Sequence, residues 1–325
     1  MMNYNPEVTV VMATYNGGKY ITEQIESIIN QTYSNWKLVI RDDGSTDDTV
    51  KIAKMYAERD RRISLLEDDR KNLGARDNFG ALIKYVAGKC EYLMFSDQDD
   101  KWNSDKIALT LQRMLEAEKT YGKDTPLLIH TDFTYVDDNL QPLTAKQHIA
   151  HLFSQQSDKI LNKLVSQNFL WGCTMMANNK LVGLIGPISK WGVNHDYWIA
   201  MVAAATGHII FIPQPTLLYR QHQDNASIGL KSGSLSHRVK RILGGWKDVV
   251  ATKNKRILLT EDLLAWAGNN MSANKKDFLE KFVKVARKGG ISAVLFCSRN
   301  DVRRQGPIQT LLYYGSLMAK FRDPQ

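Results

Sequence analysis

The stretch VTVVMATYNGG, residues 8–18, joins a short run rich in β-branched residues to an Asn-Gly-Gly turn. Residues 8–14 are predicted to form a buried strand, because apolar runs bounded by turn residues are typical of strands. Four isoleucines between residues 21 and 29 then recur on one face of an amphipathic helix. A strand, a turn and a helix in this order begin a βαβ unit.

The same alternation continues to residue 96. Strands are predicted at residues 37–41, 63–66 and 91–96, and helices at residues 75–86 and up to residue 55. Ser45 and Asp48 are placed to cap the second helix. Strands that alternate with helices predict an α/β fold with a mostly parallel central sheet flanked by helices.

Beyond residue 100 the pattern is less regular. Helices are predicted at residues 105–119 and 197–205, and strands at residues 127–131, 208–212 and 216–219, the last two split by Pro213 and Pro215. From about residue 232 the pattern is helical, with breaks at residues 244–245 and 289–290 and at Pro307. We therefore expect an α/β domain over residues 1–225 and a helical region over residues 226–325.

The composition is that of a globular protein, with 43% hydrophobic and 24% charged residues. Cys90, Cys173 and Cys297 are far apart and form no CxxC pair, which excludes a cysteine zinc site and suits a reducing compartment. The first residues lack the basic and apolar regions of a secretory signal, and no apolar run approaches the ~18 residues of a membrane span. We expect a cytoplasmic protein that at most lies on the inner face of the membrane.

The charge is unevenly distributed. Residues 226–325 hold 19 Lys and Arg against 7 Asp and Glu, whereas the preceding residues hold 24 against 27. A basic region favours an anionic partner such as lipid headgroups, a phosphorylated acceptor or nucleic acid, although it is also typical of solvated helices. The C-terminal apolar side chains suit either an interfacial membrane helix or the contact of a homodimer. They are Leu311, Leu312, Tyr313, Tyr314 and Leu317, among Arg303, Arg304, Lys320 and Arg322.

Polar clusters follow three of the predicted strands, at residues 14–16, 42–45 and 97–100. Ligands of open parallel sheets bind beyond the carboxyl ends of the strands, so these clusters should form one site. The three carboxylates of the DQDD sequence would repel one another unless a cation compensates them. Oxygen ligands of this kind suit Mg²⁺ or Mn²⁺. The alternative is an acidic turn that caps the helix beginning near Asp105.

Other phosphate-binding motifs are missing from the sequence. The chain has no GxxxxGK[ST] loop and no GxGxxG after the first strand. P-loop kinases and NAD-dependent dehydrogenases are therefore disfavoured.

Four motifs in order now carry a resemblance: ATYNGGKYITEQIESIINQTY, VIRDDGSTDDT, NLGARDNFGAL and MFSDQDDKW. Their order and spacing resemble those of the family 2 glycosyltransferases with the GT-A fold, over roughly residues 7–225. The SDQDDKW variant and the later YRQH resemble bacterial rhamnosyltransferases of cell-wall polysaccharide and O-antigen assembly. The resemblance implies a nucleotide-sugar half at about residues 1–103 and an acceptor half at about residues 104–225.

The resemblance also implies roles for individual residues. Thr14, Tyr15 and Asn16 would line the nucleotide base, Asp43 or Asp42 would bind the base or ribose, and Arg76 and Asn78 would lie near the diphosphate. Asp97 and Asp99 would form the DxD motif, with Asp99 as the direct ligand of Mn²⁺ or Mg²⁺. Helix capping by Asp43 and a surface ion pair of Arg76 are the alternatives.

An inverting transfer needs a general base on the acceptor side. Asp196 in WGVNHDYWIAM is at the position of the family's base motif, where His195 replaces the usual Glu. The nearby helix N-terminus would lower its pKa and apolar neighbours would raise it. The alternative is that Asp196 only caps the helix.

The remaining predicted site residues surround the acceptor and the metal. By resemblance, Arg220 would neutralise phosphate charge and His222 would complete the metal shell. The predicted acceptor residues are Trp171, Gly172, Cys173, His195 and Trp198. Cys173 is expected to be a small packing residue rather than a nucleophile.

The predicted activity is inverting transfer of a sugar from a nucleoside-diphosphate donor to a hydroxyl of a lipid-linked saccharide. By resemblance the favoured donor is dTDP-rhamnose, with UDP-GlcNAc, UDP-Glc and UDP-Gal as alternatives. A nucleotidyltransferase should show a basic Gly-rich loop after the first strand, and none is present. A non-catalytic sugar-nucleotide or nucleic-acid binder would not explain why Asp97, Asp99 and Asp196 occur together, so no nucleic-acid partner is expected.

Overall fold

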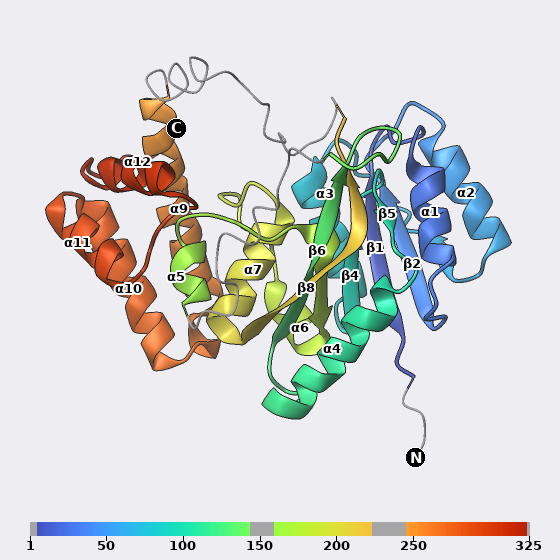
Figure 1. Cartoon of the computed structure of the whole chain (residues 1–325), viewed down its shortest axis with the longest axis horizontal. Coiled ribbons are helices and arrows are strands. Elements are labelled where there is room, and N and C mark those ends of the chain that lie inside the picture. Colours follow the sequence, from blue (N-terminus) through green and yellow to red (C-terminus); the bar gives the residue numbers. More distant parts are fainter. Residues whose placement is uncertain (1–4, 144–158, 223–244, 324–325) are drawn as a thin grey trace.

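The computed structural model describes residues 5–143, 159–222 and 245–323. Within these ranges the strands form one eight-stranded sheet in the order β3-β2-β1-β4-β7-β6-β8-β5, flanked by helices (Figure 1). The strands are β1 (Val8–Thr14), β2 (Trp36–Asp42), β3 (Ile63–Leu65), β4 (Tyr92–Ser96), β5 (Lys101–Trp102), β6 (Leu127–Val136), β7 (Met175–Asn178) and β8 (His208–Arg220). The predicted α/β class is confirmed.

The N-terminal half is the regular part of the sheet. Strands β3, β2, β1 and β4 are parallel neighbours. The helices between them are α1 (Ile21–Ile29), α2 (Thr49–Arg59) and α3 (Ala75–Val86). Ile21, Ile25 and Ile28 of α1 are fully buried, as the periodicity predicts, because they form the face that packs on the sheet. This topology brings the carboxyl ends of β1, β2 and β4 to one edge.

The second half makes the sheet mixed. Strand β7 runs antiparallel to both β4 and β6, while β6 and β8 are parallel. The predicted division into strands 208–212 and 216–219 is wrong, because β8 continues through Pro213 and Pro215. Its pairing with β6 shifts register between Thr131 and Thr134, and these irregularities accommodate residues that cannot donate a backbone hydrogen bond.

The predicted cap of α2 is also wrong. The Ser45 hydroxyl donates to Asp42 Oδ1 at 2.6 Å instead of capping the helix, and Asp48 makes no side-chain cap hydrogen bond. Asp47 takes that place, since its Oδ1 accepts from the Thr49 backbone amide at 3.1 Å. The loop after β2 is therefore folded back on its own first carboxylate.

The helices after β5 cover the rest of the sheet and extend beyond it. They are α4 (Lys106–Tyr121), α5 (Ile160–Leu164), α6 (Asn179–Ile185), α7 (His195–Thr206), α9 (Trp246–Ala267), α10 (Ala273–Lys288), α11 (Ile291–Arg299) and α12 (Pro307–Leu317). The breaks predicted at residues 289–290 and at Pro307 are confirmed, and a further break after α9 was not predicted. Residues 226–244 of the expected helical region lie outside the described residues.

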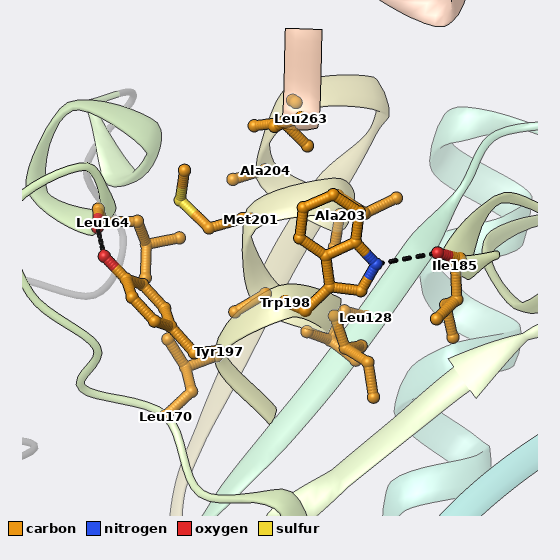
Figure 2. Close-up of a cluster of buried hydrophobic side chains, with 14 of the residues drawn as sticks. Leu128, Leu164, Leu170, Ile185, Tyr197, Trp198, Met201, Ala203, Ala204 and Leu263 are labelled. Carbon is orange, nitrogen blue, oxygen red and sulfur yellow. Dashed lines mark hydrogen bonds between the residues drawn. The ribbon is translucent and has the colours of Figure 1, made fainter. Parts of the chain in front are cut away.

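The helical region packs on the α/β part through α7 and α9. Trp198 and Met201 of α7 lie in one buried cluster with Leu263 of α9 (Figure 2). That cluster continues to Val11 and Leu93 in the sheet, so apolar burial joins the two parts. The domain boundary near residue 225 stays a prediction.

The apolar residues of α12 that were predicted to face a membrane or a partner differ in their exposure. Tyr313 and Leu317 are buried, whereas Leu311 is exposed. The buried pair therefore belongs to the packing between C-terminal helices. Among the described residues, no helix is both long and apolar enough to cross a membrane.

Candidate functional site

The three polar clusters meet at the carboxyl edge of the sheet, as the topology predicts. Gln98 holds the backbone of Tyr15 from both sides: its Oε1 accepts from the Tyr15 amide and its Nε2 donates to the Tyr15 carbonyl, both at 2.9 Å. Thr14 Oγ1 donates to Asp42 Oδ1 at 2.8 Å, and the Asn16 amide donates to Ser45 Oγ at 2.8 Å. The ends of β1, β2 and β4 thus form one surface.

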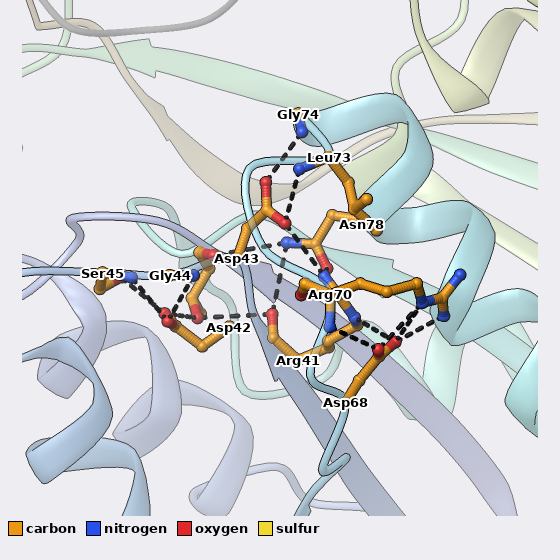
Figure 3. Close-up of polar contacts among 11 residues, drawn as sticks. Arg41, Asp42, Asp43, Gly44, Ser45, Asp68, Arg70, Leu73, Gly74 and Asn78 are labelled. Atoms are coloured by element: carbon orange, nitrogen blue, oxygen red, sulfur yellow. Dashed lines mark hydrogen bonds and ion pairs between the residues drawn. The ribbon is translucent and has the colours of Figure 1, made fainter.

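At the end of β2 a closed polar network surrounds Asp43 (Figure 3). Asp43 Oδ1 accepts from the Leu73 amide at 2.9 Å, and Oδ2 accepts from the Gly74 amide at 2.8 Å. The fully buried Arg41 donates to Asp43 Oδ1 at 3.2 Å and to Asn78 Oδ1 at 2.9 Å. Asp43 and Asn78 therefore direct their polar atoms into the protein, toward Arg41 and the turn before α3.

Asp42 is also fully engaged. Its Oδ2 accepts from the amides of Gly44 and Ser45 at 2.9 and 2.7 Å, and its Oδ1 accepts from Thr14 and Ser45. These contacts shape the loop beside Tyr15, whose side chain is exposed at the edge. A role of Asp42 or Asp43 in binding a base or ribose remains a prediction.

The carboxylates at the end of β4, unlike those at the end of β2, include a buried oxygen that has no hydrogen-bond partner in the described structure. Ligand atoms of Asp97, Asp100 and Cys173 lie within 4.8 Å of one another. Asp100 is fully buried, and its Oδ2 has no hydrogen-bond partner in the described structure. Burial, followed by repulsion from Asp99, raises the pKa of Asp97 to about 7 and raises that of Asp100 well above its usual range. Asp100 Oδ1 accepts from the Arg220 amide at 3.3 Å, so these carboxylates receive fewer hydrogen bonds than those of β2.

One positive side chain, Lys106, approaches this cluster from α4. It is fully buried and donates to Thr216 Oγ1 at 3.0 Å, while burial lowers its pKa to about 8. Asp100 and Cys173 act on it only electrostatically. Lys106 was not predicted here, and Cys173 was predicted as a packing residue of the acceptor site rather than as a neighbour of Asp97 and Asp100, because both residues come from outside the strand-end motifs.

Asp99 has a different side-chain partner from Asp97. Its Oδ2 lies 2.8 Å from His222 Nε2, and the His222 ring packs at 4.8 Å from the ring of Tyr20. The structure thus brings Asp99 and His222 together as predicted, and it groups Asp97 with Asp100 and Cys173. Asp100 was not predicted as a ligand, although it is part of the same DQDD sequence.

Arg220 and Arg76 are both held by carboxylates. Arg220, 2% exposed, forms an ion pair with Glu23, and its Nε donates to the Asp99 carbonyl at 2.8 Å. It therefore fixes the turn that carries Asp99. Arg76 pairs with the neighbouring Asp77 at 2.7 Å. The predicted contacts of both arginines with a diphosphate remain untested.

Asp196 lies in the first turn of α7 and is buried beside the β4 cluster. Its Oδ1 accepts from Asn168 Nδ2 at 3.1 Å, and the backbone amides of Tyr197 and Gly172 also donate to it. Burial raises its pKa to about 7, and the positive charge of Arg256 acts in the opposite direction. The charge of Asp196 in turn helps to raise the pKa of Asp97, so the two carboxylates belong to one electrostatic site.

Two residues predicted to contact the acceptor lie in the core. Trp198 is 1% exposed and its indole donates to the Ile185 carbonyl at 2.8 Å, so it presents no free face to a sugar. The His195 ring stacks on Phe79 at 3.8 Å, and burial lowers its pKa to about 3. A Cβ at Gly172 would lie 2.4 Å from His195 Nε2, which explains why glycine stands there. We therefore do not carry Trp198 into the proposed acceptor site.

Cys173 lies in the strand-end cluster, and Trp171 precedes the turn that carries it. Trp171 is partly exposed and packs edge-on against Phe133 at 5.0 Å between ring centroids. The Cys173 thiol is buried against Asp97 and Asp100, and burial raises its pKa well above the usual range. It is therefore a neutral thiol rather than a nucleophile.

Part of the chain is similar in sequence to a known protein family and to several bacterial proteins. Residues 9–148 match the model of glycosyl transferase family 2. The dTDP-rhamnosyl transferase RfbG of Shigella flexneri is 29% identical over 68% of this chain and 76% of its own length. TuaG of Bacillus subtilis, named for teichuronic acid biosynthesis, is 32% identical over 42% of this chain. The chain spans only 53% of TuaG.

Solved structures show the same fold at low sequence identity. Residues 1–349 of TarS from S. aureus align with a TM-score of 0.53 at 15% identity, covering 96% of this chain and 90% of that one. The mixed sheet with its flanking and C-terminal helices is therefore a GT-A-like fold. The match to the family 2 model covers residues 9–148, less than half of the chain, so this part is similar to family 2 glycosyl transferases.

Proposed function

We propose that the chain transfers a sugar from a nucleoside-diphosphate donor to a hydroxyl of a saccharide, with inversion at the anomeric carbon. The observation that carries this proposal is that Asp196, buried in the first turn of α7, lies close enough for its charge to act on Asp97 at the β4 end. A proton-accepting carboxylate and a carboxylate cluster suited to a cation thus share one edge of the sheet. Inverting transfer requires a base and a stabiliser of the leaving diphosphate in such proximity.

The residues at the β4 end fit a divalent cation. Asp100 Oδ2 is buried and unpartnered within the described structure, and burial and mutual repulsion raise the pKa values of Asp97 and Asp100. Asp97 and Asp99, with Asp100 and His222 beside them, would hold Mn²⁺ or Mg²⁺, since carboxylates and waters are their preferred ligands. The bound cation would neutralise charge on the departing diphosphate.

Asp196 is the proposed general base. A pKa near 7 suits that role, because a base works best when its pKa is near the working pH. Asn168 and the Gly172 amide fix the direction of the carboxylate through hydrogen bonds. The protein would thereby hold the accepting oxygen toward the cluster that binds the donor.

For the donor we propose dTDP-rhamnose. The similarity to RfbG, which extends over 68% of this chain, supports that choice. Another similar protein, WfgD of Escherichia coli, is named as a UDP-Glc-dependent glucosyltransferase acting on a GlcNAc-diphosphoundecaprenol. A UDP-linked sugar is therefore the alternative donor, and a lipid-linked saccharide at the inner membrane face is the proposed acceptor.

A panel of nucleotide sugars tests the proposal. Each donor is incubated with the protein in Mn²⁺ or in EDTA, and release of nucleoside diphosphate is measured. We expect release from one donor, most rapidly from dTDP-rhamnose, and its loss in EDTA. Release that persists in EDTA would overturn the metal assignment. Release of pyrophosphate from a nucleoside triphosphate would instead show a nucleotidyltransferase.

A further inference from the structure

Two arginines of the C-terminal helical region lie near Tyr197, the residue that follows Asp196 in α7. Arg256 lies on α9, and its guanidinium carbon is 4.1 Å from the centre of the Tyr197 ring. Arg304 lies between α11 and α12, and its charge interacts with both Arg256 and Tyr197. Tyr197 is fixed in turn, since its hydroxyl donates to the Leu164 carbonyl of α5 (Figure 2).

Neither arginine is neutralised by an ion pair. Arg256 Nε and Nη1 are buried and have no hydrogen-bond partner, and among the described residues no carboxylate forms an ion pair with either side chain. Arg304 Nε reaches only the Ser166 carbonyl, at 3.4 Å. Burial, reinforced by Arg256, lowers the pKa of Arg304. Both residues as a whole remain partly exposed.

Other arginines of the chain show what is unusual about this pair. Arg41 is paired with Asp43 and Asp68, Arg220 with Glu23, and Arg287 with Glu261. Buried positive charge is ordinarily compensated in this way, because an unpaired buried charge is strongly unfavourable. Asp196 forms no ion pair with Arg256, and burial raises the pKa of its carboxyl to about 7.

Guanidinium groups with free N–H donors match the oxygens of phosphate, which they bind through paired hydrogen bonds. The donor diphosphate does not account for the pair, because its proposed site is the β4 end around Asp97 and Asp99. The acceptor is the substrate that must reach Asp196, because Asp196 is the proposed base. An acceptor that carries phosphate would place an anionic group beside two cations that have no ion-pair partner among the described residues.

We propose that Arg256 and Arg304 form a binding site for a phosphate group of the acceptor, which positions a saccharide hydroxyl beside Asp196. This inference rests on the proposed glycosyl transfer and narrows its acceptor to a phosphate-bearing saccharide. The C-terminal helices are then part of the acceptor site rather than an appendage. The chemistry is shared by a phosphodiester within a polymer and by a diphosphate that links a saccharide to a lipid.

Calorimetric titration with inorganic phosphate in EDTA tests the site without any need for the acceptor. We expect one phosphate to bind per chain, and we expect Arg256→Gln and Arg304→Gln each to weaken binding about tenfold or more. Arg303→Gln is the matched control: its side chain is 52% exposed and already paired with Asp301, so affinity should change less than about twofold. Tighter binding of pyrophosphate than of phosphate would indicate a diphosphate, and equal binding a phosphodiester.

Unchanged phosphate affinity in Arg256→Gln and Arg304→Gln, or no binding by the unmodified chain, would overturn the proposal. Circular dichroism verifies folding, and Arg256→Lys serves if Arg256→Gln does not fold. Lysine keeps the charge but loses the paired donors. The phosphate affinity of Arg256→Lys should therefore fall between those of the unmodified chain and Arg256→Gln. Donor hydrolysis is measured in parallel on the unmodified chain. Its absence would overturn the proposed function, while phosphate binding that depends on both arginines would stand.

Discussion

The ends of β2 and β4 both carry aspartates, but the protein satisfies the carboxylate oxygens with hydrogen bonds more completely at β2 than at β4. At β2, Asp42 and Asp43 accept hydrogen bonds from backbone amides, hydroxyls and Arg41 on both of their oxygens. At β4, Asp100 keeps a buried oxygen without a partner in the described structure, and the pKa of Asp97 is raised to about 7. Carboxylates saturated by the protein build the loop, whereas unsaturated ones are available to a ligand.

Asp196 resembles the carboxylates of the β4 end, because its pKa is also raised by burial. Its pKa is raised mainly by burial, and its charge acts on Asp97. An unsaturated site of this kind is expected to destabilise the free protein and to become favourable when a cation and donor bind. The β2 end should contribute to stability in the absence of any ligand.

The largest expected effect is on transfer. Asp196→Asn should lower the rate by about 10²- to 10⁴-fold, because asparagine cannot accept the proton of the acceptor. The rate is measured with donor and acceptor saturating, and the thermal midpoint shows that the variant is folded. Full activity in Asp196→Asn would remove the proposed base.

The next effect is on stability at β2. Asp43→Ala should lower the free energy of unfolding by about 3–5 kcal/mol, because it leaves Arg41 buried beside fewer partners. Urea denaturation measures this change. Asp124→Asn is the control, since the Asp124 side chain is 90% exposed in its pair with Lys180 and should contribute less than about 1 kcal/mol. A loss at Asp43 no larger than the control would erase the contrast between the strand ends.

The pH dependence of transfer follows from the pKa of Asp196 near 7. Below that pH the carboxyl is protonated and inactive as a base, so the rate should fall about tenfold per unit and level off above it. Burial favours the protonated form in the folded chain. The stability contributed by this group is therefore greatest below its unfolded pKa and lost as the pH rises through about 7. A rate profile flat from pH 5 to 9 would contradict the assignment.

The smallest expected change is at Asp97. Asp97→Asn should leave the thermal midpoint at pH 8 unchanged or raise it, because it removes a carboxylate that burial and Asp99 disfavour in the charged form. The measurement is a thermal unfolding scan without metal. A clear decrease would show that Asp97 is saturated as Asp43 is.

The sequence predicted the elements more accurately than the states of their side chains. The bounds of β1 and α3 are as predicted, because local periodicity determines them. The strand-end clusters meet because parallel strands bring their carboxyl ends together. Strand β8 differs from prediction because its pairing with β6 overrides the local signal of two prolines.

The state of each carboxylate depends on partners distant in sequence. Asp43 is saturated because Arg41 is buried against Asn78, 37 residues further along, and an arginine in a strand is ordinarily expected to face solvent. Cys173 joins Asp97 only through the turn before β7. Arg256 reaches Tyr197 from a different helix. No local pattern contains these contacts.

Binding of Mn²⁺ tests the central contrast most directly. Paramagnetic resonance of free Mn²⁺ is followed while the protein is titrated in the presence of a nucleoside diphosphate. We predict one bound Mn²⁺ per chain, a binding that Asp97→Asn and Asp99→Asn weaken by about tenfold or more and that Asp42→Asn leaves in place. Equal Mn²⁺ binding by Asp99→Asn and the unmodified chain, or its loss in Asp42→Asn alone, would contradict the account.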